Sequence, residues 1–136
     1  MDDNPVIGQC LCGAVKFHIF GEFERFFLCH CARCRKDSGS AHSANLFSST
    51  ARIIWVSGED NIKMFRLTGS RHVKSFCSDC GSALPVSKPE FGLLVVPAGS
   101  LESRIEIRPN AHICCSSRTN WDNDPASVAR IDGLPR

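Results

Sequence analysis

The chain has 136 residues, of which 43% are hydrophobic and 22% are charged. These values are typical of a soluble globular protein, so we expect residues 1–136 to form a single domain and exclude a disordered or fibrous chain. The formal net charge of +2 comes from dispersed residues, with Arg33, Arg35 and Lys36 as the one dense basic group, so we expect no nucleic-acid partner.

Alternating apolar and polar residues predict a mainly β chain. In AVKFHIF (14–20), the apolar residues Val15, Phe17 and Ile19 share one face, as expected of a half-buried strand. Similar patterns predict further strands at 52–58, 62–68, 73–77, 93–99 and 104–109.

One short helix is predicted at 32–39, where Gly39 is suited to a left-handed cap at the C-terminal end. The last residues, 122–136, include Pro125 and Pro135 and predict an irregular, partly extended tail.

The first ten residues, MDDNPVIGQC, are acidic and lack the basic start and apolar centre of a signal peptide. No apolar run approaches the roughly 20 residues that span a bilayer. We therefore expect a cytoplasmic protein without a membrane partner. In that reducing compartment, nine cysteines indicate metal binding or catalysis rather than disulfides.

Two short motifs each supply half of a metal site. Cys10 and Cys12 in QCLCG are two residues apart, so in a strand their thiols point the same way. Cys77 and Cys80 in FCSDCGS form a CxxC turn followed by a glycine. Together the four thiols suit a closed tetrahedral zinc that stabilises the fold.

The segment CHCARC (29–34) contains a second CxxC, formed by Cys31 and Cys34. Those two residues could also join Cys77 and Cys80 in a zinc ribbon, and the spacing does not decide between the two pairings. If Cys77 and Cys80 pair with the first motif instead, Cys29, Cys31 and Cys34 remain together. Three protein ligands and a vacant fourth position are typical of a catalytic zinc.

A fourth side chain would convert this open site into a closed one. The candidates are Cys114, Cys115, His42 and His112. His30 is a poor candidate, because it lies between two ligands and projects to the opposite side of an extended segment. We expect Cys114 and Cys115 to be small buried hydrophobic residues, since adjacent side chains at a strand end cannot easily share one metal.

The motifs GQCLCGAVKF, CHCARCRKDSGSAH and FCSDCGSALP, followed by PNAHI and Trp121, together resemble the Gfa family. This family is named for the glutathione-dependent formaldehyde-activating enzyme and also includes centromere protein V. The resemblance covers about residues 8–121. One departure is the Cys114-Cys115 pair, which stands where relatives usually carry larger apolar residues.

The resemblance implies a β-tent fold with two zinc ions per chain. The implied structural zinc is held by Cys10, Cys12, Cys77 and Cys80, and the implied catalytic zinc by Cys29, Cys31 and Cys34. The implied activity joins glutathione to formaldehyde as S-(hydroxymethyl)glutathione, and is classed as a carbon–sulfur lyase in the reverse direction. A shared scaffold can nevertheless carry different chemistry.

The residues after the three-cysteine motif suggest how a thiol substrate would bind. Arg35 and Lys36 are expected either to pair with substrate carboxylates or to form a solvated surface. His42 and Asn45 are expected to line the same pocket. The alternative functions are a non-catalytic zinc module that binds a partner, and a redox or metal-exchange centre.

Overall fold

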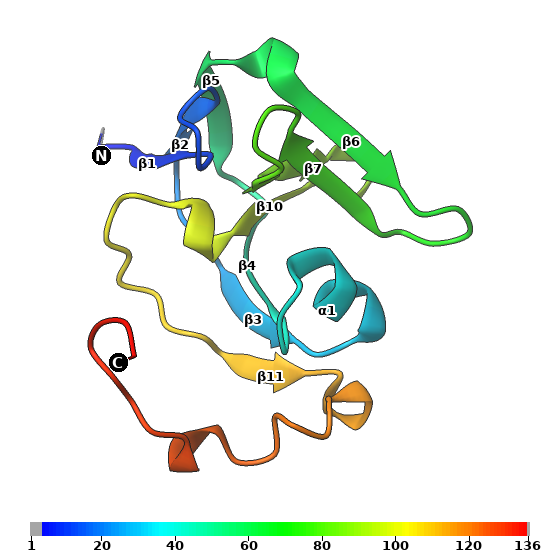
Figure 1. Ribbon diagram of the computed structural model, residues 1–136. Helices are drawn as coiled ribbons and strands as arrows, with labels where there is room; N and C mark the ends of the chain where they lie inside the picture. Colours follow the sequence, from blue (N-terminus) through cyan, green and yellow to red (C-terminus); the bar gives the residue numbers. More distant parts are fainter. Residues whose placement is uncertain (1–3, 136) are drawn as a thin grey trace.

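The computed structural model describes residues 4–135, whose regular structure is mostly short β-strands (Figure 1). The strands are β1 (Val6–Gln9), β2 (Lys16–Phe20), β3 (Arg25–Cys29), β4 (Ser43–Ser48), β5 (Arg52–Ser57), β6 (Ile62–Arg66), β7 (Val73–Cys77), β8 (Ala83–Leu84), β9 (Val86–Lys88), β10 (Leu93–Pro97) and β11 (Ala111–Ile113). One α-helix, α1 (Ala32–Ser38), and short 3-10 turns complete this part of the chain. The mainly β prediction is therefore confirmed.

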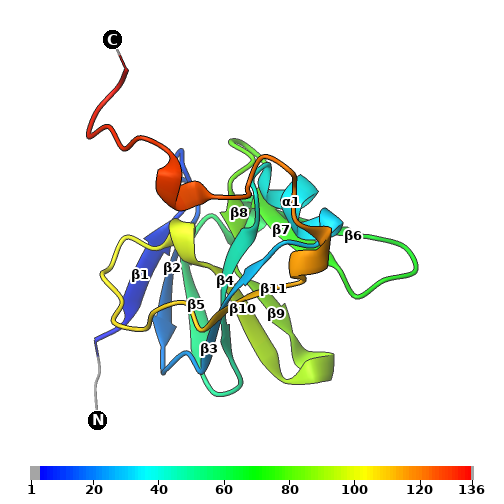
Figure 2. The same cartoon turned by 90° about the horizontal axis from the view of Figure 1, so that it is seen from below.

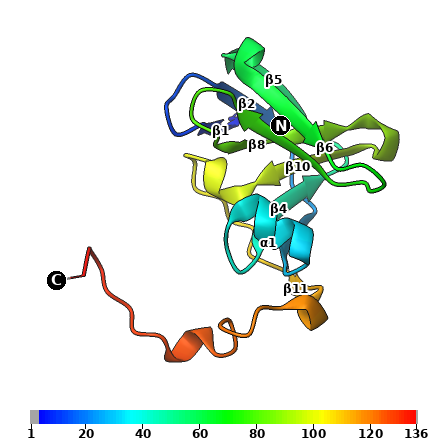
Figure 3. The same cartoon turned by 45° about the vertical axis from the view of Figure 1, so that its right-hand side comes forward.

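The strands form three sheets, with the orders β1-β2-β5, β11-β3-β4-β10-β9 and β6-β7-β8. All the strand pairs are antiparallel except β11 and β3, which run parallel. Helix α1 lies between the β6–β7 hairpin and β11 (Figures 1 and 3). Among residues 4–135, no helix has both the length and the apolar character needed to cross a membrane.

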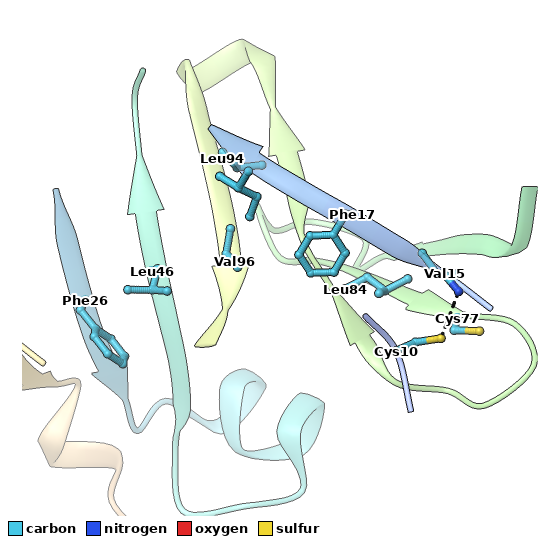
Figure 4. Packing of buried hydrophobic residues seen from close by; sticks show 10 residues of the cluster. Cys10, Val15, Phe17, Phe26, Leu46, Cys77, Leu84, Leu94 and Val96 are labelled. Atoms are coloured by element: carbon cyan, nitrogen blue, oxygen red, sulfur yellow. Dashed lines mark hydrogen bonds between the residues drawn. The ribbon is translucent and has the colours of Figure 1, made fainter. Parts of the chain in front are cut away.

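The core lies where the three sheets meet (Figure 4). Phe17 of β2 is fully buried among apolar side chains of β4, β8 and β10, and its burial contributes roughly 3 kcal/mol to folding. Its ring covers Gly8, where an added Cβ would clash with the Phe17 ring and with the backbone carbonyl of Ser100. A glycine is therefore required at this position of β1, and the predicted inward face of 14–20 is confirmed.

The predicted helix and most predicted strands are present, and α1 ends at Gly39 with φ 67° as expected. The strand predicted at 104–109 is wrong, because this segment is extended but forms no strand ladder. Ile105 and Ile107 do pack against the core, which explains their alternation. Pairing with β3 begins only after Asn110, whose N–H donates to the carbonyl of Phe26.

The chain beyond β11 carries little regular structure. Within residues 122–135 the structure has one 3-10 turn, Pro125–Ser127. The segment runs along the outside of the molecule and leaves it at the C-terminal end (Figures 2 and 3). Its apolar side chains Val128, Ile131 and Leu134 are exposed.

Candidate metal centres

The first group of metal-binding side chains joins the turn after β1 to the turn between β7 and β8. It consists of Cys10, Cys12, Cys77 and Cys80, whose sulfur atoms all lie within 4.8 Å of one another. This group supports the pairing of CxC with the later CxxC rather than the zinc ribbon.

The expected strand geometry of Cys10 and Cys12 is wrong, because both residues lie in a turn. Gly13, with φ 80°, donates its N–H to the carbonyl of Cys10 and closes this turn. The two thiols converge because the chain curls around them, not because of strand alternation.

The sulfur spacing fits a tetrahedral zinc. Four sulfurs at Zn–S distances of about 2.3 Å would be about 3.8 Å apart. Cys10 and Cys12 Sγ are 3.6 Å apart, and Cys12 and Cys77 Sγ are 3.9 Å apart. Cys10 and Cys77 are also buried in the core, so these residues could hold a structural metal ion.

The four thiols differ in how readily they ionise, because their hydrogen bonds and neighbours differ. Ser82 Oγ accepts the N–H of Leu11 and lies 3.3 Å from Cys80 Sγ. The Ser82 side chain and nearby backbone N–H groups lower the pKa of Cys80 to about 5. The Ala14 N–H favours the Cys12 thiolate, but the crowded sulfurs, led by Cys10, raise the pKa of Cys12 to about 12. Full ionisation of the group therefore calls for a cation.

We expect Ser82→Ala to move zinc release to higher pH by about one pH unit. Because the pKa of Cys80 is lowered, its thiolate persists well below the pKa of a free thiol and is lost only as the pH falls through about 5. Without Ser82 that loss begins at higher pH. A metal-indicator dye measures the release, and Ser78→Ala, in the same turn, should match the unmodified protein. An unchanged release midpoint in Ser82→Ala would contradict this assignment.

The second group joins the end of β3 to the start of α1. Cys29 is the last residue of β3, Cys31 is the N-cap of α1 and Cys34 lies in its first turn. Their sulfur atoms lie within 4.8 Å of one another. The N–H of Cys34 donates to Cys31 Sγ at 3.4 Å, so the helix start itself brings two of the three ligands together.

The three thiols also differ in how readily they ionise. Burial raises the pKa values of Cys29 and Cys34. Burial also opposes ionisation of Cys31, but hydrogen bonds from the Cys34 N–H and the neighbouring thiols lower its pKa overall. Without a cation the group therefore holds one thiolate readily, whereas a bound metal ion would stabilise all three.

Among residues 4–135, this second group has three ligands, because none of the four candidate closing residues belongs to it. Cys114 and Cys115 are exposed, so their predicted burial is wrong. Strand β11 ends at Ile113, and Cys114 then adopts a left-handed backbone with φ 58° that turns the chain away from the sheet.

The two candidate histidines lie together beside His30 instead. The ring centroids of His42 and His112 are each 5.0 Å from that of His30, and His30 Nε2 is 2.8 Å from His112 Nδ1. His30 is only 1% exposed, and burial lowers its pKa. The fold thus brings together three histidines that are up to 82 residues apart in sequence.

A cavity of about 230 Å³ opens beside the three-cysteine group, and Cys34 forms part of its wall. Other lining residues come from α1, β4, the β6–β7 hairpin and strands β8 (Ala83–Leu84), β9 and β10, and include Asp37, Ser43, Asn45, His72 and Lys74. The predicted pocket residue Asn45 lies in this wall, with its Nδ2 3.4 Å from Ser43 Oγ. Arg35, Lys36 and His42 are not among the lining residues that the structure describes.

Comparison with known proteins identifies the family. A family model described as glutathione-dependent formaldehyde-activating enzyme matches residues 5–117, most of the chain. This chain belongs to the Gfa family. The matched range contains both cysteine groups and ends before the C-terminal tail.

One curated relative supports the Gfa assignment, and one solved structure shares the fold. A Halomonas elongata protein, provisionally named a glutathione-dependent formaldehyde-activating enzyme, is 33% identical over 124 residues, covering 84% of this chain and 77% of its own. A crystal structure of a Rhodobacter sphaeroides protein, a structural genomics target, superposes with a TM-score of 0.55 at 23% identity. It covers 78% of this chain and 98% of its own, and this likeness concerns the fold.

Proposed function

We propose that this Gfa chain is an enzyme that joins a thiol to a small aldehyde and cleaves the adduct in reverse, as a carbon–sulfur lyase. The thiol is glutathione or a similar molecule, and the aldehyde is formaldehyde or another of similar size. The observation that carries the proposal is the position of Cys34, which belongs both to the three-cysteine group and to the wall of the cavity. A substrate in the cavity would therefore be next to the candidate metal centre.

The reaction needs a thiolate and a place for one proton. The substrate sulfur forms a bond to the aldehyde carbon, the carbonyl π bond breaks, and the thiol proton ends on the new hydroxyl oxygen. A free thiol has a pKa of about 8.5, so most of it is protonated at neutral pH. A zinc ion held by Cys29, Cys31 and Cys34 would supply the positive charge that favours the thiolate.

The protein's own groups would bind and orient the substrate. Asn45 presents an amide at the cavity wall for a polar group of the thiol. Arg35 is half-buried and Lys36 is exposed in the last turn of α1, so they would act only on a substrate that extends beyond the cavity. We place the activity in the cytoplasm, where thiols such as glutathione stay reduced.

The four-cysteine group would hold a second zinc with a structural role. It connects the chain near residue 10 with the chain near residue 80, so its metal would tie the first sheet to the third. Cys10 and Cys77 are buried in the core, and none of the four cysteines lines the cavity. A closed four-sulfur set of this kind stabilises a fold and leaves no position for substrate.

The test combines a zinc count with exchange NMR of glutathione and formaldehyde at equilibrium, with and without the protein. We expect two zinc ions per chain and faster exchange than in the protein-free sample. Two zinc ions without acceleration for glutathione or other small thiols would instead favour a non-catalytic zinc module. One zinc ion, with Cys29, Cys31 and Cys34 freely alkylated, would favour a redox or metal-exchange centre.

A further inference from the structure

Three side chains from two distant segments meet at the wall of the cavity that contains Cys34. Asp37 Oδ2 lies 2.7 Å from His72 Nε2, and Asp37 Oδ1 lies 3.2 Å from Lys74 Nζ. All three side chains are largely buried, with 20% to 27% of their surface exposed. Such a linked set is a candidate for proton transfer, because a carboxylate fixes the orientation and tautomer of the imidazole.

The helix positions this set next to the candidate metal centre. Cys34 and Asp37 are three residues apart in α1, so they lie on the same face of the helix. Both line the cavity, as does His72. A substrate thiol held beside Cys34 would therefore lie close to the Asp37–His72 pair.

The hydrogen bond to Asp37 determines which ring nitrogen of His72 is available. A neutral imidazole that donates from Nε2 to a carboxylate keeps its lone pair on Nδ1. Within residues 4–135, Nδ1 of His72 has no hydrogen-bond partner. The backbone of His72 is held in place, since its N–H donates to Ser70 Oγ and its carbonyl accepts from Leu67.

We propose that His72 is the general acid–base group of the thiol–aldehyde reaction and that Asp37 positions it. In the synthetic direction, Nδ1 takes the proton of the substrate thiol as the sulfur–carbon bond forms. The carbonyl electron pair moves to oxygen, and the imidazolium returns the same proton to that oxygen. In the reverse direction Nδ1 takes the hydroxyl proton, the carbon–sulfur bond breaks, and the proton returns to sulfur.

The charged groups around His72 are compatible with this role. Asp37 faces it from α1 and stabilises the imidazolium, while Lys74 of β7 shares the same carboxylate. Lys88 of β9 lines the cavity and donates to the carbonyl of Arg71. Among residues 4–135, Asp37 is the carboxylate in contact with His72, and Lys74 also holds it, which keeps its orientation constant when the imidazole gains or loses its proton.

His72 could instead have a purely structural role, holding α1 against the β6–β7 hairpin. The variant His72→Gln distinguishes this structural role from the proposed catalytic role. Glutamine can still donate to Asp37, so the tie persists, but it cannot transfer a proton. We expect kcat for exchange to fall about 100-fold, with an unchanged zinc count, melting temperature and KM for the thiol. The limb of the pH–rate profile that reflects an ionising imidazole should also disappear.

Two further variants complete the experiment. His18→Gln is the matched control, because His18 lies on β2 against Phe20, away from the cavity, and it should behave as the unmodified protein. Asp37→Asn should lower kcat about tenfold and keep the imidazole limb, since it changes the orientation and stabilisation of His72 but leaves the base.

Because this inference rests on the proposed function, the outcomes are kept distinct. If the unmodified protein fails to accelerate exchange, both the proposed function and the role of His72 are overturned. An active protein whose His72→Gln variant keeps its rate and pH profile overturns the role of His72 alone. If the rate of His72→Gln falls only together with its zinc content and melting temperature, His72 has a structural role, and the proposed acid–base role is also overturned.

Discussion

Replacing Cys34 with serine is expected to reduce thiol–aldehyde exchange about 1000-fold, because charge stabilisation by a bound metal contributes several kcal/mol to catalysis. Cys34 is one of three sulfurs in its group and the one that lines the cavity. A serine hydroxyl is a poor zinc ligand, so zinc should fall from two ions per chain to one. Exchange NMR and metal analysis on the same sample measure both effects.

Cys115→Ser is the matched control for this substitution. Cys115 is exposed, belongs to neither metal-binding group and has its Sγ 3.6 Å from the carbonyl of His112. It should keep both zinc ions and the full rate. If Cys34→Ser retained two zinc ions and the unmodified rate, the three-cysteine group would not be the catalytic centre.

Cys77→Ser is expected to remove the other zinc and leave the domain largely unfolded at 37 °C. Cys77 is fully buried within the core cluster, and its sulfur is one of the four in the first group. Structural zinc sites contribute about 10 kcal/mol or more to folding, comparable with the whole stability of a small domain. Partial loss of that contribution is enough to unfold the chain.

Thermal unfolding followed by circular dichroism, with zinc analysis, measures the effect of Cys77→Ser. A strong chelator added to the unmodified protein should produce the same loss of structure, whereas Cys114→Ser should melt as the unmodified protein does. The structural role would be refuted by a Cys77→Ser variant that loses zinc yet melts within a few degrees of the unmodified protein.

Several elements could be predicted because their signals are local. The burial of Val15, Phe17 and Ile19 follows from alternation within a single strand. The helix at 32–38 follows from its ending at Gly39. By contrast, the alternation of Ile105 and Ile107 correctly indicated a face that packs against the core but not a strand, because a ladder also requires a neighbouring strand in register.

The closely spaced cysteines showed which side chains are able to bind metal, since they carry that chemistry wherever the chain places them. Their spacing left open whether Cys77 and Cys80 join Cys10 and Cys12, as the family resemblance implied, or the cysteines near residue 30. The packing of the chain answers this, because the turn after β1 lies against the turn after β7. The same holds for Asp37 and His72, 35 residues apart, because contacts between separate elements arise from how the sheets and helix pack and have no local signal in the sequence.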